Sequence, residues 1–149
     1  LREQVPDIAL TTEIIVGYPG ETEEDFQETL DVVHKIRYYS AFTYIYSKRT
    51  GTPAAVMEDQ VPEEVVKDRY DRMLKEVQEI SKEMAERFTG REELVLVEEV
   101  NGQMEGYVTG RLSNNHVVHF QGDASLVGQI VKVRLDECRG FYYMGSRIE

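Results

Sequence analysis

The stretch Ile14-Ile15-Val16-Gly17-Tyr18-Pro19-Gly20-Glu21-Thr22-Glu23-Glu24-Asp25-Phe26 joins an apolar run to a glycine and proline turn and then to a helix start. The run Ile14–Val16 is β-branched and apolar throughout, as expected of a parallel strand that is covered on both faces. Thr22 and Asp25 have the spacing of a capping box, which predicts a helix from about Glu23. In a strand, turn and helix unit of this kind, ligands bind at the carboxyl end of the strand, where these glycines lie.

The remainder of the first 89 residues continues this α/β pattern. Apolar residues three and four positions apart predict a helix over 23–37, and the aromatic and β-branched run 41–46 predicts a second strand. A helix between two strands indicates a right-handed parallel crossover. A basic loop over 47–55 follows the second strand, and an apolar stripe predicts a long amphipathic helix over 62–88.

From residue 91 onward, short β-rich runs alternate with turn residues. Asn101-Gly102 has the pattern of a two-residue hairpin between the first two runs. Five short strands within about 60 residues predict a small closed or nearly closed β-barrel of the OB type. The sequence therefore predicts two domains, an α/β part over 1–89 and a β-barrel over 90–149. The five strands are predicted at about 93–100, 103–109, 116–120, 129–135 and 141–148.

The chain of 149 residues is 41% hydrophobic and carries a formal net charge of −11, which on average repels nucleic acid. Most of the acid lies in residues 1–89, with 11 Lys and Arg against 19 Asp and Glu, whereas residues 90–149 hold six and nine. No apolar run approaches the roughly 20 residues that cross a bilayer, and no secretory leader is present, so a cytoplasmic protein without membrane contact is expected. Because the chain begins at Leu1 without Met, we expect it to be a piece of a longer polypeptide.

Two ordered motifs resemble a known family. Residues 15–22, and residues 46–54 after the second strand, resemble the last third of the radical-SAM barrel in the methylthiotransferases. The final 60 residues resemble the TRAM domain that ends those proteins, and the runs 41–46, 59–62 and 109–111 most resemble the MiaB type. The fold class implied is α/β: the C-terminal fragment of a radical-SAM, TIM-like α/β barrel, followed by a small five-stranded OB-like β-barrel (TRAM).

The resemblance implies a tRNA-modifying enzyme that inserts a methylthio group at C2 of an isopentenylated adenosine next to the anticodon. The family uses S-adenosyl-L-methionine and two 4Fe-4S clusters. This sequence has one cysteine, Cys138, and no CxxxCxxC, so it cannot hold such a cluster by itself. We therefore expect the chain alone to bind no cofactor and to be inactive. Its expected partners are the N-terminal domains of the same protein and the tRNA anticodon stem-loop.

The candidate cofactor residues follow the two predicted strands. The resemblance places the turn after the first strand beside the adenine end of S-adenosylmethionine, and the loop after the second strand faces the same side. The alternative is an ordinary turn in which Glu21 is a first-turn helix acid and Tyr46 packs in the core. Arg49 suits a carboxylate or phosphate, although Lys48 and Thr50 stand where the family has proline. The candidates are Ile15, Gly17, Pro19, Gly20, Glu21, Tyr46, Ser47 and Arg49.

The candidates for RNA contact are cations and histidines of the predicted barrel. Lys132 and Arg134 alternate with apolar residues and so share one face of a strand. The alternative for any single position is a solvated outer sheet face. As a set, with Phe120, Tyr142 and Tyr143 as candidate stacking partners, they indicate an OB-like surface for tRNA. The candidates are Arg111, His116, His119, Lys132, Arg134 and Arg139.

No catalytic residue and no metal site are predicted in this chain, because its histidines lack the partner set of a zinc site. Two alternatives stay open. The parent protein could be a non-catalytic RNA-binding adaptor, or a methylthiotransferase that acts on threonylcarbamoyladenosine or on a ribosomal-protein aspartate. Because two barrel strands without their neighbours expose edges and an apolar face, we also expect the isolated chain to self-associate or swap strands.

Overall fold

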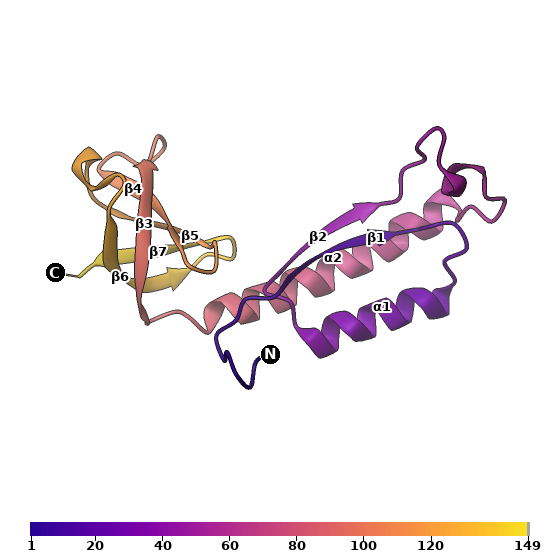
Figure 1. The fold of residues 1–149 in the computed structure, drawn as a ribbon, viewed down its shortest axis with the longest axis horizontal. Helices are drawn as coiled ribbons and strands as arrows, with labels where there is room; N and C mark the ends of the chain where they lie inside the picture. The colour runs from indigo at the N-terminus through magenta and orange to yellow at the C-terminus, as the bar shows by residue number, and fades with distance from the viewer. Residues whose placement is uncertain (149) are drawn as a thin grey trace. The chain divides into compact units, whose positions relative to one another are not determined.

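The computed structural model describes residues 1–148, which divide into two compact units (Figure 1). The first unit comprises residues 9–81, and the second comprises residues 1–8 together with those from 82 onward. The elements in chain order are β1 (Thr11–Val16), α1 (Glu23–Ile36), β2 (Ser40–Ile45), the 3₁₀ turn η1 (Pro53–Val56), α2 (Glu63–Glu86), β3 (Glu92–Val100), β4 (Tyr107–Leu112), β5 (Val117–Gln121), the 3₁₀ turn η2 (Ala124–Leu126), β6 (Ile130–Cys138) and β7 (Tyr142–Arg147).

The first unit packs two parallel strands against two helices (Figure 1). β1 and β2 pair in parallel along their whole length, and α1 connects them, so the predicted parallel connection is confirmed. The predicted capping box is also present, since Thr22 and Asp25 exchange backbone and side-chain hydrogen bonds at the start of α1. The core of this unit includes Ile14, Val16, Phe26, Leu30, Val33, Val66, Met73 and Val77.

The two-stranded sheet is covered on one face only. Ile14 and Val16 are buried, whereas Ile15 between them is 56% exposed. Tyr44 pairs with Ile15 on the same face, and both Tyr44 and Phe42 are exposed as well. The prediction that β1 is buried on both faces is therefore wrong for this structure, because α1 and α2 supply apolar side chains to one face and none of the described residues buries the other.

The second unit contains a closed barrel of five strands in the order β3-β4-β5-β7-β6 (Figure 1). Neighbouring strands are antiparallel except for β5 and β7, which are parallel. The predicted five-stranded barrel is confirmed, and its arrangement is the Greek-key order of an OB-type barrel. Its inward side chains form a second core, which includes Val95, Val97, Val108, Val118, Phe120, Val133, Leu135 and Tyr143.

The last turn of α2 belongs to this second unit. The Tyr143 hydroxyl, inside the barrel wall, donates a hydrogen bond of 2.6 Å to the Ala85 carbonyl oxygen. Ala85 itself is fully buried. The compact unit consequently takes in α2 from Lys82, whereas the domain boundary predicted from sequence lies near residue 90. The roles predicted for the two domains stay predictions.

Asn101-Gly102 does not form the predicted two-residue hairpin. β4 begins at Tyr107 rather than near Gln103, so the connection from β3 is longer than expected. The Asn101 side-chain oxygen accepts hydrogen bonds from the backbone N–H groups of Gln103 and Met104, at 2.8 and 2.9 Å. This side-chain turn replaces the tight backbone turn that the dipeptide predicts.

We expect Gly110→Ala to destabilise the barrel. A Cβ at this position of β4 would lie 2.5 Å from Val95 Cγ1 and 2.6 Å from the Leu96 carbonyl oxygen, inside the β3–β4 ladder. Urea unfolding followed by circular dichroism should show a loss of about 1–3 kcal/mol in the free energy of unfolding. Gly102→Ala is the control, because a Cβ there would have nothing within 4 Å. Equal stability of the two variants would contradict this packing.

Candidate functional site

The carboxyl ends of β1 and β2 lie side by side and bring the predicted cofactor loops together. The Tyr46 backbone N–H donates to the Val16 carbonyl oxygen at 2.8 Å. The rings of Tyr18 and Tyr46 meet edge to face, with centroids 5.4 Å apart. Ser47 and Arg49 follow at exposed positions. The turn after β1 and the loop after β2 therefore form one edge, which we call the strand-end edge.

The strand-end edge offers an apolar face and one buried hydroxyl. Ile15 and its partner Tyr44 are exposed on the open face of the sheet. The Tyr46 hydroxyl is buried, and it has no hydrogen-bond partner among residues 1–148. A buried hydroxyl without a partner costs about 1–3 kcal/mol, so a polar group supplied from outside these residues would stabilise it. This combination suits a ligand that has both an apolar ring and polar atoms.

The glycines of the turn after β1 are required by protein packing. Gly17 and Gly20 have φ of 80° and 84°, a region that favours glycine. A Cβ at Gly17 would lie 2.6 Å from Val66 Cγ2, and one at Gly20 would lie 2.6 Å from Asp59 Oδ2. Gly17 and Pro19 are buried. The turn thus packs against the start of α2 and the segment before it, whatever ligand binds nearby.

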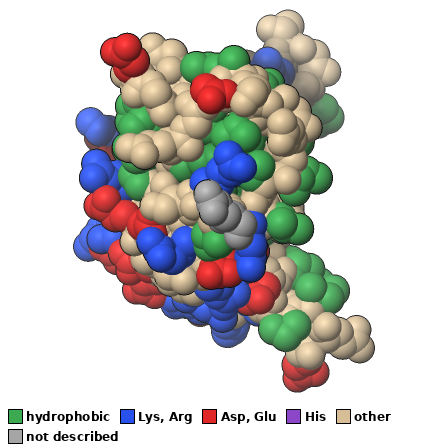
Figure 2. Space-filling model, turned by 90° about the vertical axis from the view of Figure 1, so that its left-hand side faces the viewer, with side chains coloured by type: hydrophobic (Ala, Val, Ile, Leu, Met, Phe, Trp, Pro, Cys, Tyr) green, Lys and Arg blue, Asp and Glu red, His purple; other side chains and the backbone are tan. Residues whose placement is uncertain are grey.

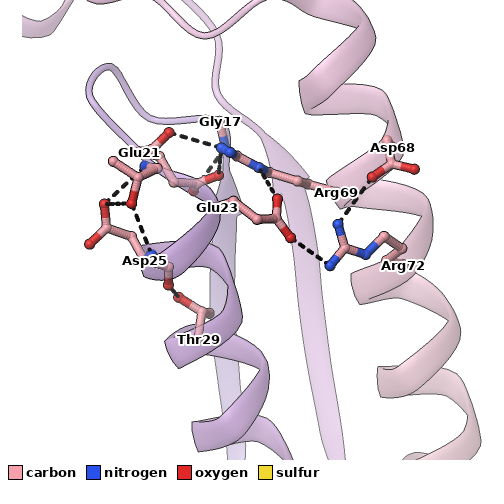
Figure 3. A network of polar contacts seen from close by, with 9 residues as sticks. Gly17, Glu21, Glu23, Asp25, Thr29, Asp68, Arg69 and Arg72 are labelled. Carbon is pink, nitrogen blue, oxygen red and sulfur yellow. Dashed lines mark hydrogen bonds and ion pairs between the residues drawn. The ribbon is translucent and has the colours of Figure 1, made fainter.

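A buried arginine of α2 holds the carboxylate of Glu21 (Figure 3). The Arg69 side chain is 6% exposed, and its Nη1 donates to the side-chain and backbone oxygens of Glu21, both at 2.9 Å. The second carboxylate oxygen of Glu21 accepts the Gly17 N–H at 3.1 Å. Glu21 therefore links the turn after β1 to α2, and both of its carboxylate oxygens have partners within the protein.

Glu23 extends this network into the first turn of α1. It accepts hydrogen bonds from Arg69 at 3.2 Å and from Arg72 at 2.7 Å, and Arg72 also pairs with Asp68 at 3.1 Å (Figure 3). The hydrogen bond from Arg72 holds the pKa of the Glu23 carboxyl below its ordinary value. Both guanidinium groups lie over the Phe26 ring, 5.8 and 4.7 Å from its centroid. Charge pairing and ring contacts together fix α1 against α2.

Arg69 is not among the residues predicted from the sequence, although the sequence contains a signal for it. Val66 lies three residues before Arg69 and Met73 lies four residues after it, and both are buried. Arg69 therefore stands on the apolar stripe of α2 rather than on its exposed face. A charged residue on such a stripe is almost never buried unless it is paired, so this position predicts a buried ion pair.

The four cations predicted to bind RNA all form ion pairs within the barrel. Each pair lies at an exposed position, where it contributes about 0–1 kcal/mol and a phosphate can compete with it. On the face shown in Figure 2, Lys and Arg side chains lie next to Asp and Glu side chains. The structure therefore places these cations at the surface as neutralised pairs. The pairs are Arg111 with Glu98 at 2.9 Å, Lys132 with Glu92 at 2.6 Å, Arg134 with Asp136 at 2.7 Å and Arg139 with Glu137 at 2.9 Å.

His119 is part of a polar cluster on the outer face of β4 and β5. Its Nδ1 lies 3.1 Å from both Thr109 Oγ1 and Asn101 Nδ2, and its ring centroid lies 4.9 Å from that of Tyr142. Partial burial lowers the pKa of His119, so the ring is neutral at pH 7. It contributes an aromatic surface here rather than a charge for phosphate.

His116 lies deeper, beside the barrel core. Its ring centroid is 4.7 Å from that of Tyr143, and burial lowers the pKa of its imidazole too. Tyr143 and Phe120 are both 0% exposed. The prediction that Phe120 and Tyr143 stack on RNA bases is therefore wrong, because strand alternation turns both rings inward. Of the three aromatic candidates, Tyr142 points outward, beside His119.

Within residues 1–148, no three His, Cys, Asp or Glu side chains gather in a way that could hold a metal ion. Neither helix in that same range is both long and apolar enough to cross a membrane. Cys138 is partly buried at the end of β6, and this burial raises the pKa of its thiol.

We expect Arg69→Met to destabilise the first unit strongly, because it leaves the Glu21 carboxylate in a site only 13% exposed without its cation. Urea unfolding should show a loss of about 3–5 kcal/mol. Arg72→Met is the control: its ion pairs are exposed, so about 1 kcal/mol or less is expected. Adding Glu21→Gln to Arg69→Met should recover part of the loss, because no buried charge then remains. Equal effects of Arg69→Met and Arg72→Met would contradict the assigned burial.

Comparisons with known proteins find a domain family that matches the barrel and relatives that match the whole chain. Residues 86–146 match the TRAM domain family. The whole chain is 56% identical over 149 residues to a protein of Lachnoclostridium phytofermentans named tRNA-2-methylthio-N(6)-dimethylallyladenosine synthase, of which it covers 33%. Proteins of the same name from Acetivibrio thermocellus and Alkaliphilus oremlandii are 53% and 48% identical, over 98% and 100% of this chain and 30% and 32% of their own lengths.

The chain thus spans about one third of the length of the curated relatives that it matches. The matches extend over essentially all of it, and the TRAM match falls on the barrel unit. These findings confirm the resemblance to the MiaB-type tRNA methylthiotransferases: the chain carries a TRAM domain and is similar along its whole length to one third of a tRNA-2-methylthio-N(6)-dimethylallyladenosine synthase, as a C-terminal part of such a protein would be.

Proposed function

We propose that this chain is the C-terminal part of a radical-SAM tRNA methylthiotransferase. The parent enzyme adds a methylthio group to C2 of isopentenyladenosine next to the tRNA anticodon, in the cytoplasm. The observation that carries this proposal is the 56% identity, over the whole chain, to a protein named for that reaction. We assign residues 1–89 to the end of the radical-SAM barrel and residues 90–149 to the RNA-binding module.

When bound, S-adenosylmethionine would supply the radical chemistry of this reaction. The strand-end edge fits its adenosyl part, because Ile15 offers an exposed apolar surface and the Tyr46 hydroxyl has no partner among residues 1–148. Ser47 and Arg49 lie exposed on the same loop, where they can meet the ligand's carboxylate. The turn after β1 sets the shape of this edge, and it is formed by Gly17, Pro19, Gly20 and Glu21.

The two 4Fe-4S clusters do not fit this chain. Several cysteine thiolates hold each such cluster, and the sequence contains Cys138 alone. We therefore assign both clusters, and with them catalysis, to the rest of the parent protein. By itself the chain then contributes part of a nucleoside site and an RNA-binding barrel.

Two partners follow from this proposal. The remaining N-terminal domains of the parent protein cover the open face of β1 and β2, where Ile15, Phe42 and Tyr44 are exposed. The anticodon stem-loop of tRNA binds the barrel. Without the parent's other domains, the open face and the edges of the sheet favour self-association of the isolated chain.

The decisive experiment uses the full-length parent protein with reconstituted clusters. It is incubated with S-adenosylmethionine and with tRNA that carries isopentenyladenosine, and the digested nucleosides are analysed by mass spectrometry. Appearance of the 2-methylthio nucleoside supports the proposal. Modification only of threonylcarbamoyladenosine, or only of a ribosomal-protein aspartate, would reassign the enzyme. RNA binding without any modified product would favour the adaptor.

We expect Tyr46→Phe to weaken S-adenosylmethionine binding by the full-length protein without lowering its stability. The substitution removes a hydroxyl that has no protein partner among residues 1–148, so folding loses no hydrogen bond there. A ligand hydrogen bond of about 0.5–1.5 kcal/mol corresponds to an affinity loss of about 2- to 12-fold, measurable by equilibrium dialysis. Tyr38→Phe, on the segment between α1 and β2, serves as the control. Unchanged affinity would remove Tyr46 from the proposed site.

A further inference from the structure

A groove of about 460 Å³ opens on the outer surface of the barrel, where β4 begins and β7 ends. Tyr107 and Gln121 are cross-strand neighbours on β4 and β5 and form one wall. Met144, Ser146 and Arg147 come from β7. None of these residues is among the RNA candidates predicted from the sequence. The volume lies within the range of small-ligand sites, and the groove combines an aromatic ring, an amide and a cation.

Arg147 differs from the other cations of the barrel. The sequence from Arg91 onward contains six Lys and Arg, and five of them pair with an acid within 4 Å. Arg147 is exposed, and no ion pair within 4 Å includes it among residues 1–148; its charge does help to lower the pKa of Asp123. A phosphate at Arg147 therefore does not need to displace a carboxylate. At Arg111, Lys132, Arg134 and Arg139, a phosphate has to displace the carboxylate of the ion pair.

Asp136 supplies the carboxylate that lines the groove, and both of its oxygens already accept hydrogen bonds within the barrel. Asp136 stands at the irregularity in β6, where the register with β7 shifts. One of its oxygens accepts a hydrogen bond from Arg134 at 2.7 Å, and the other accepts one from the Ser146 hydroxyl at 2.6 Å. Its charge is thus compensated by neighbours, which reduces its repulsion of an anion. Arg147 is the cation of the groove, and no carboxylate among residues 1–148 lies within ion-pair distance of it.

We propose that this groove, the Tyr107–Arg147 groove, binds one single-stranded nucleotide of RNA. Tyr107 stacks on the base, Gln121 hydrogen-bonds to the base edge, and Arg147 binds a phosphate. The location agrees with OB-type barrels, which bind oligonucleotides on their second and third strands, here β4 and β5. The inference rests on the proposed function, because tRNA is the RNA that the parent enzyme would present.

The test measures binding of the complete chain to a fluorescein-labelled RNA anticodon stem-loop by fluorescence anisotropy. Loss of a stacking partner in Tyr107→Ala should weaken binding about 5- to 30-fold, whereas Tyr107→Phe keeps the ring and should stay within about twofold. Arg147→Gln should weaken binding and lower the slope of log affinity against log salt by about one, the value for one phosphate contact. Lys82→Gln is the matched control, because Lys82 is exposed, already paired with Glu86 and not among the RNA candidates.

The outcomes separate this inference from the proposed function. Circular dichroism first checks that each variant is folded, which is expected since Arg147 is exposed and Tyr107 is half-buried. If Tyr107→Ala and Arg147→Gln bind the RNA as tightly as the unsubstituted chain, the groove is overturned while tRNA binding stands. If the unsubstituted chain binds no RNA at all, both the groove and the RNA role of the barrel are overturned. The methylthiolation assay is read independently of either result.

Discussion

The buried ion pair between Arg69 and Glu21 is the interaction on which the first unit depends. A guanidinium that is 6% exposed must be paired, and within residues 1–148 its carboxylate partners are Glu21 and Glu23. Replacing both members of such a pair by apolar residues is often neutral for stability, whereas removing one member leaves an unpaired buried charge. The pair therefore matters chiefly because each charge requires the other in its place. The Glu21 carboxylate also binds the Gly17 N–H, and the position of α2 thereby dictates the shape of the turn after β1. The Glu21 contacts to Arg69 and to the Gly17 N–H therefore fix the geometry of the strand-end edge.

Under the proposed function the barrel faces a different electrostatic problem, because it has to bind a polyanion although the chain is acidic, with a net charge of −11. Its cations are mostly cancelled by neighbouring acids, so long-range attraction contributes little. Affinity then has to come from short-range contacts, in which aromatic rings and amides count for more than charge. Outward side chains such as Tyr107, His119 and Tyr142 supply such contacts on β4, β5 and β7. A shallow dependence on salt is the physical signature of this arrangement.

Periodicity predicted the elements well, since the apolar spacing of both helices and the five β-rich runs reappear in the structure. The failures have local causes. Asn101 bonds to the backbone with its side chain, which overrides the hairpin preference of Asn-Gly. Residue type alone favours Phe120 and Tyr143 as RNA contacts, although strand alternation places Phe120 inward with Val118. The Tyr107–Arg147 groove joins the ends of three strands that are far apart in sequence, and no local pattern reports such a juxtaposition.

The glycine motif after β1 illustrates why a resemblance to a cofactor motif does not identify the atoms that touch a cofactor. Gly17 and Gly20 are fixed by positive φ and by contact with Val66 and Asp59, which lie 49 and 39 residues later in the chain, respectively. A larger residue at either glycine would collide with protein before it met a ligand. The glycine motif therefore allows the start of α2 and the segment before it to pack closely against the end of β1. The side chains at those positions must in turn fit against the glycines. The surface that remains for the proposed ligand is the open face beside the turn, where Ile15 is exposed, together with the Tyr46 hydroxyl, which has no hydrogen-bond partner within residues 1–148.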